Sequence, residues 1–174
     1  MENSDVLLYL LLYARGKSMR DNEPIPTKIH LQKQIFLLQK RYPFTEIKNK
    51  YEFIPLFYGP FSKQLAVDLN DGVDSLMISD DGGISLTQKG FSYASKLWNS
   101  LSDSEKIAII KIKEEFNRIT TGQLIDYVYD HYPKFSRNSA LKKESVDNYF
   151  DSFWKENDLS VEYFVDIVKK ERAE

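Results

Sequence analysis

Apolar residues recur along most of this chain at the spacing of an α-helix. The first apolar run, Val6 to Ala14, is continuous and predicts a helix within residues 3–16 that is buried on all sides. Gly16 can end this helix in a left-handed conformation. A second helix is expected over Lys28 to Tyr42, which Pro26 and Thr27 open and Pro43 closes.

The expected second helix carries an apolar stripe and a polar side. Gln32 and Gln39 fall inside the apolar arc, so we expect their amides to bond to neighbouring backbone groups. The opposite side is mostly polar, which is typical of a solvated helix face. The residues on that side are His30, Lys33, Gln34, Leu37, Lys40 and Arg41.

The next stretch combines aromatic residues with a Gly-Pro pair. Residues 51–58 read as an extended segment, and Gly59 with Pro60 is expected to form a turn. Two starts are open for the helix that follows. Either Pro60 takes its first position or Ser62 caps it, and the helix is expected to run to Gly72.

A β-hairpin and further helices are expected after residue 72. Two short β-type runs flank the turn sequence DDGG and predict the hairpin. Ser102 with Glu105 has the signature of a capping box, and Thr121 is the expected cap of a later helix. Two amphipathic helices are expected from Ser145 and Ser160. The helices expected between the hairpin and these two cover residues 88–100, 103–118 and 122–132.

The order helix, helix, turn, helix, hairpin is that of a winged helix. We therefore expect a mainly α fold with a small β-hairpin, built as a winged-helix-like core with additional packed helices. At 174 residues the chain is long enough for one domain with its own core. We assign residues 1–144 to that domain and residues 145–174 to a C-terminal helical extension packed on it.

Charge argues against DNA binding by the usual surface of a winged helix. Between residues 68 and 88 the chain has five Asp and no Lys or Arg, which repels phosphate. Residues 26–50 have six Lys or Arg and one Glu, a net charge of +5, whereas residues 144–174 have nine acidic and four basic residues, a net charge of −5. The basic stretch is either an ordinary solvated face or a patch for an acidic partner, protein or nucleic acid.

Composition and motifs restrict the chemistry. The chain has no Cys and two His, so disulfides, thiolate metal sites and Cys nucleophiles are excluded. There is no glycine-rich phosphate loop, and His30 and His131 do not stand at ligand spacing on one helix. We therefore expect no cofactor, no metal and no enzymatic activity, while an enzyme site assembled from distant residues stays a third hypothesis.

The apolar run near the start is too short for a membrane segment. It has nine residues, against about 20 that a spanning helix needs. The preceding sequence MENSD is acidic, which does not fit a signal peptide. We expect a cytoplasmic protein without a membrane segment.

Three motifs together resemble a known group of proteins. The sequence HLQKQIFLLQK, His30 to Lys40, is similar to a helix of the SocA-like antitoxin, or Panacea-domain, families, and FIPLFYGPFSKQL is similar to their Tyr-Gly-Pro turn. The sequence ISLTQKG and the segment Leu124 to Ser139 resemble a related phage-associated branch, the YwgA-like proteins. The resemblance covers residues 5–140. It implies a small, mostly helical cytoplasmic protein without a cofactor, commonly encoded near phage or mobile elements, and many such relatives neutralise a toxin by direct contact.

The leading functional hypothesis is a non-enzymatic, antitoxin-like interaction module that binds and neutralises or regulates a toxin-like partner protein. The alternative is a DNA-binding transcriptional regulator that uses the basic helix in residues 26–50. The aromatic helix after Ser145 belongs either to the core or to a homodimer or partner face. The candidate partner-contacting residues, aromatic at the turn and basic on the second helix, are Phe57, Tyr58, Phe61, Lys33, Lys40 and Arg41.

Overall fold

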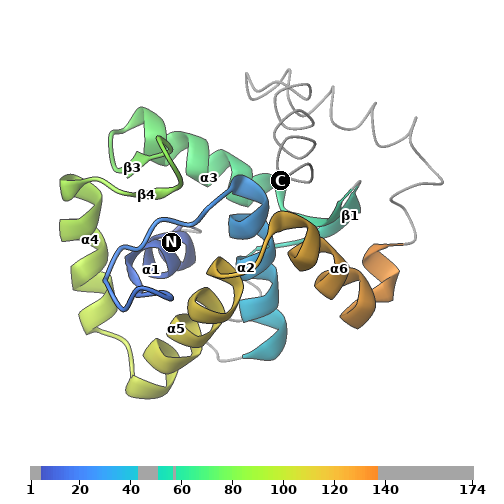
Figure 1. The fold of residues 1–174 in the computed structure, drawn as a ribbon. Coiled ribbons are helices and arrows are strands. Elements are labelled where there is room, and N and C mark those ends of the chain that lie inside the picture. Colours follow the sequence, from blue (N-terminus) through green and yellow to red (C-terminus); the bar gives the residue numbers. More distant parts are fainter. Residues whose placement is uncertain (1–4, 43–50, 57, 137–174) are drawn as a thin grey trace.

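The structure, a computed structural model, describes residues 5–42, 51–56 and 58–136 (Figure 1). Within these residues the chain is mainly helical and has two small antiparallel hairpins, which confirms the expected fold class. The helices are α1 (Val6–Tyr13), α2 (Lys28–Arg41), α3 (Lys63–Asp74), α4 (Gln88–Asn99), α5 (Asp103–Asn117) and α6 (Thr121–His131), followed by the 3-10 turn η1 (Pro133–Phe135). The strands are β1 (Ile54–Leu56), β2 (Gly59–Phe61), β3 (Ile78–Ser79) and β4 (Ser85–Leu86).

Helix α1 lies among the other helices (Figure 1) and packs against α2, α3, α4 and α5. Leu8 and Leu11 expose none of their surface, so the expected burial on all sides is confirmed. The helix ends at Tyr13, and Gly16 does not end it in a left-handed conformation, contrary to expectation. A side chain at position 16 would instead collide with the Glu23 carboxylate.

Helix α2 starts as expected, because the Thr27 hydroxyl accepts a hydrogen bond from the backbone N–H of His30 at 3.0 Å. The expectation of a solvated polar side is wrong over most of the helix. All residues from Ile29 to Leu38 are buried, and Lys33 is only 3% exposed. The reason is that α5, α6 and β2 pack around the side of α2 that carries the polar residues.

The hairpin β1–β2 places Gly59 and Pro60 inside a strand. Gly59 pairs with Leu56, and Pro60 pairs with Pro55. The connection between the strands is residues 57–58, so the expected turn at Gly59 and Pro60 is corrected. Proline has no backbone N–H to donate, but each strand of a two-stranded sheet has one edge without a hydrogen-bonding neighbour strand, and proline is tolerated there.

Helix α3 is started by Ser62, whose hydroxyl accepts from the backbone N–H of Leu65 at 3.2 Å. Of the two predicted starts, the serine cap is therefore the one observed. The helix continues past Gly72 and ends at Asp74. Gly72 is needed for close packing, because a Cβ at this position would collide with the side chain of Ile78 in β3.

The hairpin β3–β4 forms around the DDGG sequence, as expected. Gly82 and Gly83 both have positive φ angles, of 71° and 111°, in its connecting loop. A bridge between Ile25 and Ile84 joins the hairpin to the loop that precedes α2. The two hairpins lie well apart, with β3–β4 at the upper left and β1 at the right of Figure 1.

The caps of α5 and α6 agree with the sequence to within one residue. Ser102 caps α5 by accepting from the backbone N–H of Glu105 at 3.3 Å, and the Glu105 carboxylate accepts from the Ser102 hydroxyl at 2.7 Å. Thr120, not Thr121, caps α6, and Gln123 completes its capping box. The difference arises because Thr120 keeps an extended backbone while Thr121 is already helical.

Some expectations concern parts of the chain that are not described. The helices from Ser145 and Ser160, and the packing of residues 145–174 on the domain, lie outside the described residues. The order of α1, α2, α3 and β3–β4 agrees with the expected succession of elements, while the likeness to a winged helix stays a prediction. In the part of the chain that the structure describes, no helix has the length and apolar character to cross a membrane.

Candidate functional site

Two glutamines of α2 hold the segment that contains hairpin β1–β2. The amide of Gln32 donates to the carbonyl of Ser62 at 3.1 Å and accepts from its backbone N–H at 2.9 Å. The amide of Gln39 forms the same pair of bonds with Tyr51, both at 2.9 Å. The expectation that both amides bond to backbone is confirmed. We call each such pair an amide clamp, and the two clamps hold on α2 the residues that precede β1 and follow β2.

A small apolar cluster lies where the hairpin meets α2 and α6. Ile29 of α2 and Ile125 of α6 are buried, and the partly exposed Tyr58 and Tyr129 pack on them. The cluster is separate from the main hydrophobic core. Because three distant segments build it, its shape depends on the tertiary fold. We call this cluster, together with the neighbouring Lys33, the hairpin face; Ile29, Lys33 and Ile125 are buried in it, and only the two tyrosines are partly exposed.

Gly59 lets the hairpin approach this face closely. Its φ of 104° lies in a region that residues with side chains rarely adopt. A Cβ at Gly59 would lie 3.4 Å from Cε of Lys33 and 3.4 Å from a ring carbon of Tyr129. The Leu-Gln-Lys part of α2 and the Tyr-Gly-Pro sequence of the hairpin are therefore in direct proximity.

The structure separates the aromatic residues that were expected to contact a partner. Tyr58 is partly exposed, whereas Phe61 is only 4% exposed and belongs to the interior. Phe57 lies outside the described residues. Tyr129, which the sequence did not single out, stands beside Tyr58 on the hairpin face. Its spacing of four residues from the apolar Ile125 is the signal that could have placed it on the same side of α6.

The basic residues of α2 do not gather into one exposed patch. Lys33 is buried next to Gly59, while Lys40 is exposed and its ammonium lies 5.7 Å from the ring centroid of Phe36. Residues 43–50, which include Lys48 and Lys50, lie outside the described residues.

Arg41, the last residue of α2, is held by bonds to α5 and α6. Its guanidinium forms a two-pronged ion pair with the Glu115 carboxylate, at 2.6 and 3.3 Å, and donates a short hydrogen bond to the Tyr127 hydroxyl. Hydrogen bonding to Glu115 raises the pKa of Arg41 above its usual value, against the opposing effect of burial. The ring of Tyr127 in turn stacks on His131, with centroids 4.0 Å apart. Arg41 thus joins α2 to α5 and α6.

His30 has a structural position. Its Nε2 lies 2.9 Å from the carbonyl of Ile119, and its Nδ1 lies 2.9 Å from the Thr27 hydroxyl. Since a carbonyl can only accept, we assign the proton of the neutral ring to Nε2. Burial lowers the pKa of His30, the bond to Ile119 opposes this, and Lys33 lowers it further. The neutral ring links α2 to the connection between α5 and α6.

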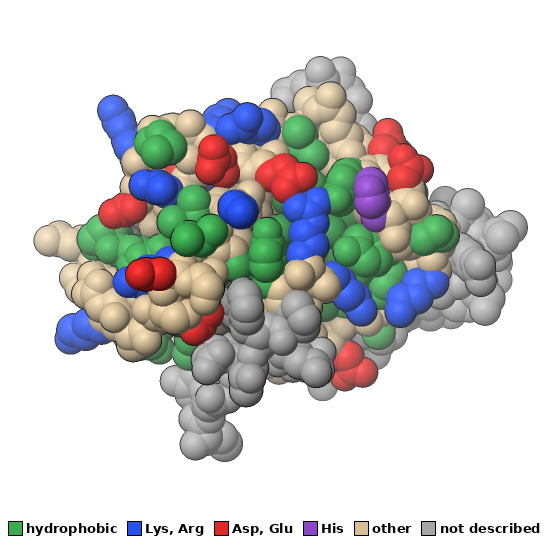
Figure 2. All heavy atoms as spheres, turned by 90° about the horizontal axis from the view of Figure 1, so that it is seen from below, with side chains coloured by type: hydrophobic (Ala, Val, Ile, Leu, Met, Phe, Trp, Pro, Cys, Tyr) green, Lys and Arg blue, Asp and Glu red, His purple; other side chains and the backbone are tan. Residues whose placement is uncertain are grey.

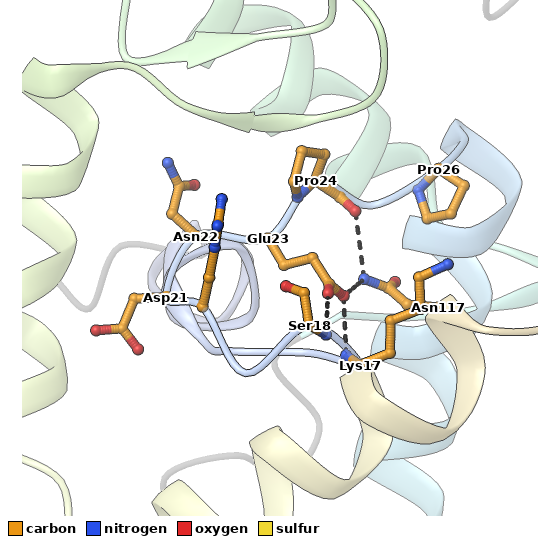
Figure 3. A pocket seen from close by; sticks show the side chains of 9 residues that line it. Lys17, Ser18, Asp21, Asn22, Glu23, Pro24, Pro26 and Asn117 are labelled. Atoms are coloured by element: carbon orange, nitrogen blue, oxygen red, sulfur yellow. Dashed lines mark hydrogen bonds between the residues drawn. The ribbon is translucent and has the colours of Figure 1, made fainter.

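A hollow of about 520 Å³, to which mostly polar and charged residues contribute, lies beside the loop between α1 and α2 (Figure 3). The Glu23 carboxylate accepts from the backbone N–H of Ser18 at 2.6 Å, from that of Lys17 at 3.1 Å and from the amide of Asn117 at 2.7 Å. Burial opposes ionisation, but these bonds leave the pKa of Glu23 lowered. The Asn117 oxygen accepts from Gln34 of α2 at 2.7 Å. The Glu23 carboxylate is therefore engaged in holding its own loop.

A buried lysine ends helix α1. Lys113 of α5 exposes none of its surface and donates to the carbonyls of Leu12 and Ala14 at 2.8 and 2.6 Å. These carbonyls have no partner within the helix, so the ammonium satisfies them. Burial lowers the pKa of Lys113 to about 7, although Glu23 and Asp21 act in the opposite direction.

Carboxylates near the start of α1 also serve the fold. Asp68 accepts from the Tyr51 hydroxyl at 2.8 Å and from the Gln64 amide at 2.7 Å. Burial, and then the nearby Asp68, raise the pKa of Asp5. Among residues 5–42, 51–56 and 58–136, no group of three or more His, Cys, Asp or Glu is arranged to hold a metal ion.

One face of the molecule carries mixed charge. Figure 2 shows a face on which basic and acidic side chains are interspersed among apolar ones, without a large area of one sign. Asp80 and Asp81 are exposed at the tip of hairpin β3–β4.

Comparison of the chain with known protein families, with curated proteins and with solved structures found no match. The resemblance to the SocA-like and YwgA-like families therefore stays a prediction that depends on the short motifs.

Proposed function

We propose that this protein is an antitoxin-like interaction module, which binds a partner protein through the hairpin face and restrains it. One observation carries the proposal. The two motifs that resemble antitoxin families meet at this face, where Lys33 lies against Gly59. Tyr58 and Tyr129 stand beside this contact and keep part of their surface exposed.

The hairpin face has the properties of a protein-binding surface. Tyrosine offers a large apolar ring and a polar hydroxyl, and aromatic anchors often supply much of the energy of an interface. Gln32 and Gln39 clamp both ends of the hairpin, and Ile29 and Ile125 support the rings from below. A surface that is ordered before binding loses less conformational entropy when the partner arrives.

The positions of the buried ionisable groups support a non-enzymatic role. Lys113 bonds to the end of α1, Glu23 bonds to the loop before α2, and Asp68 accepts from Tyr51. Each of these groups positions the fold through the bonds that it makes. We therefore place the function at the surface of the molecule.

The test is purification of the protein from its host cell, with and without nuclease, followed by mass spectrometry. The wild type is compared with the double variant Tyr58→Ala, Tyr129→Ala and with the control Ile107→Ala, which removes an exposed apolar side chain from α5. We expect one stoichiometric protein partner that survives nuclease, is lost from the double variant and is kept by the control. A thermal melt of each variant checks that it folds.

Three results would contradict the proposal. One is the absence of any stoichiometric protein partner. Another is a partner that binds the folded double variant as well as it binds the wild type. The third is recovery of nucleic acid with proteins that disappear on nuclease treatment, which would favour the DNA-binding alternative.

A further inference from the structure

We infer that Leu76, in the link between α3 and β3, is the apolar anchor of a second docking surface, for a protein that presents Lys or Arg side chains around an apolar pocket. The docking does not depend on the proposed function, because this link adjoins hairpin β3–β4, which lies well apart from hairpin β1–β2 (Figure 1). Its backbone conformation, its exposure and the charge around it all point to this role.

Leu76 stands at a position where helices most often have glycine. Its φ of 60° lies in the left-handed region that side chains disfavour. The backbone N–H of Leu76 donates to the carbonyl of Val73 at 3.1 Å, and that of Met77 donates to the carbonyl of Gly72 at 2.9 Å. These two bonds form a Schellman motif, whose left-handed residue is usually Gly. Glycine at position 76 would close the motif without this strain, so the fold itself does not call for leucine.

The start of α4 holds the strained backbone in place. The Thr87 hydroxyl donates to the carbonyl of Leu76 at 2.6 Å, and the backbone N–H of Thr87 donates to the carbonyl of Met77 at 3.1 Å. Strained residues persist where the surrounding structure fixes them, and they cluster at functional sites. The backbone that carries the Leu76 side chain is therefore ordered before a partner arrives, which reduces the entropic cost of binding.

The Leu76 side chain is also unusually accessible. Leu76 is 73% exposed, against 61% for Met19 and 51% for Ile107. Val73 and Met77, close to it in the chain, are partly exposed as well, so the apolar surface extends beyond one side chain. Met19 shares a positive φ, of 65°, but polar and charged residues occupy the two positions on either side of it. Met19 is therefore a matched control.

Acidic side chains predominate around the link. Four exposed carboxylates lie on the last turn of α3 and at the tip of hairpin β3–β4: Asp71, Asp74, Asp80 and Asp81. Two lysines approach the same elements, since Lys89 donates to the carbonyl of Ser75 at 3.4 Å and the partly buried Lys28 interacts with Asp80. The excess of negative charge, together with the negative end of the α3 dipole, favours a partner with Lys or Arg and repels nucleic acid.

The experiment compares full-length variants in thermal melts and in capture of proteins from a nuclease-treated lysate of the host cell. Leu76→Gly removes both the side chain and the strain, Leu76→Ala removes the side chain alone, and Leu76→Met keeps a long apolar side chain. Met19→Gly is the control, because it removes an exposed apolar side chain from another left-handed position. A protein that distinguishes the variants is identified by mass spectrometry and purified, and its affinity for each variant is measured at low and at high salt.

We expect Leu76→Gly to melt roughly 2–4 °C above the wild type because it relieves the strain, whereas Leu76→Ala does not rise. One protein should be captured by the wild type and by Met19→Gly but not by Leu76→Gly. Once purified, it should bind Leu76→Gly and Leu76→Ala at least roughly tenfold more weakly than the wild type, and Leu76→Met almost as well as the wild type. High salt should weaken its binding, because salt screens the attraction between opposite charges.

Two binding results would overturn the inference. One is the absence of any protein that Met19→Gly keeps and Leu76→Gly loses, and the other is a captured protein that binds Leu76→Gly as tightly as the wild type. Equal melting temperatures for Leu76→Gly and Leu76→Ala would also overturn it, since the strain would then be absent.

These results are distinguishable from a failure of the proposed function. The double variant Tyr58→Ala, Tyr129→Ala leaves Leu76 in place and should still capture the protein that docks there. In the same way, Leu76→Gly should still capture a partner that binds the hairpin face.

Discussion

The two hairpins of this molecule are held by the same device but have different surroundings. Hairpin β1–β2 is clamped by Gln32 of α2, and all three residues of β2 are buried. Hairpin β3–β4 is clamped by Asn22, whose amide donates to the carbonyl of Leu86 at 3.0 Å and accepts from its N–H at 2.7 Å. The tip of this second hairpin is exposed and acidic.

The comparison shows that a strong local turn signal marks only one of the two hairpins. The DDGG sequence marks β3–β4 clearly because its two glycines adopt positive φ angles. The β1–β2 hairpin has no such signal, and its shape depends on contacts with α2 and α6. The hairpin that is harder to recognise is the one at which the aromatic and basic residues meet.

The largest expected effect is loss of the clamp on the buried hairpin. Gln32→Ala leaves the N–H and the carbonyl of Ser62 without these partners, in a region away from water. Unsatisfied buried groups cost about 1–3 kcal/mol each, so we expect a loss of roughly 2–4 kcal/mol in the free energy of unfolding. Urea denaturation measures it.

The matched variant at the other hairpin is Asn22→Ala. Asn22 is only partly buried, so water can replace part of the hydrogen bonding that its amide gives to the backbone of Leu86. We therefore expect a loss of about 1–2 kcal/mol in the free energy of unfolding. Equal losses for the two variants would show that the hairpins are not held differently.

The buried Lys113 of α5, which bonds to the end of α1, should make stability depend on pH. Burial lowers the pKa of Lys113 to about 7 in the folded state, from an ordinary value of 10.5. Between these values the unfolded chain binds more protons than the folded one, so the free energy of unfolding rises with pH in this window. We expect a rise on the order of 2 kcal/mol between pH 7 and pH 9.

The control for this pH dependence is Lys113→Met, which keeps much of the length of the side chain. Denaturation at several pH values should show a smaller rise for the variant than for the wild type. A rise of the same size in both proteins would assign the dependence to other groups.

The smallest expected effect is the difference in stability loss between two glycine variants, one from each hairpin. Gly59→Ala introduces a side chain at a φ of 104°, between Lys33 and Tyr129, and we expect a loss of about 2 kcal/mol. Gly82→Ala meets nothing within 4 Å and has a φ of 71°, so its loss should be about 1 kcal/mol. Thermal melts rank the two variants, and the opposite order would contradict the close approach at the hairpin face.

Periodicity and capping residues predicted most of the described helices. The stripe of α2, the caps Thr27 and Ser102, and the backbone bonds of Gln32 and Gln39 all follow from local sequence. These features were predictable because their cause lies within a few residues of the chain.

The hairpin face and the buried polar groups could not be predicted in the same way. Lys33 was expected on a solvent-exposed face, because β2 and α6, which pack over it, are distant in sequence. Lys113 stands four residues after the buried Ile109, on the same side of α5, which hinted at burial. The carbonyls that accept from Lys113 belong to α1, and only the tertiary fold brings them together.

The most direct test of the central claim is hydrogen exchange of the backbone amides in the free protein and in its complex with the purified partner. The proposal predicts slower exchange on binding at residues 58–61 and 121–129, with little change at residues 78–86. Slower exchange at residues 78–86 with no change around Tyr58 and Tyr129 would contradict it, and would move the binding surface to the acidic hairpin.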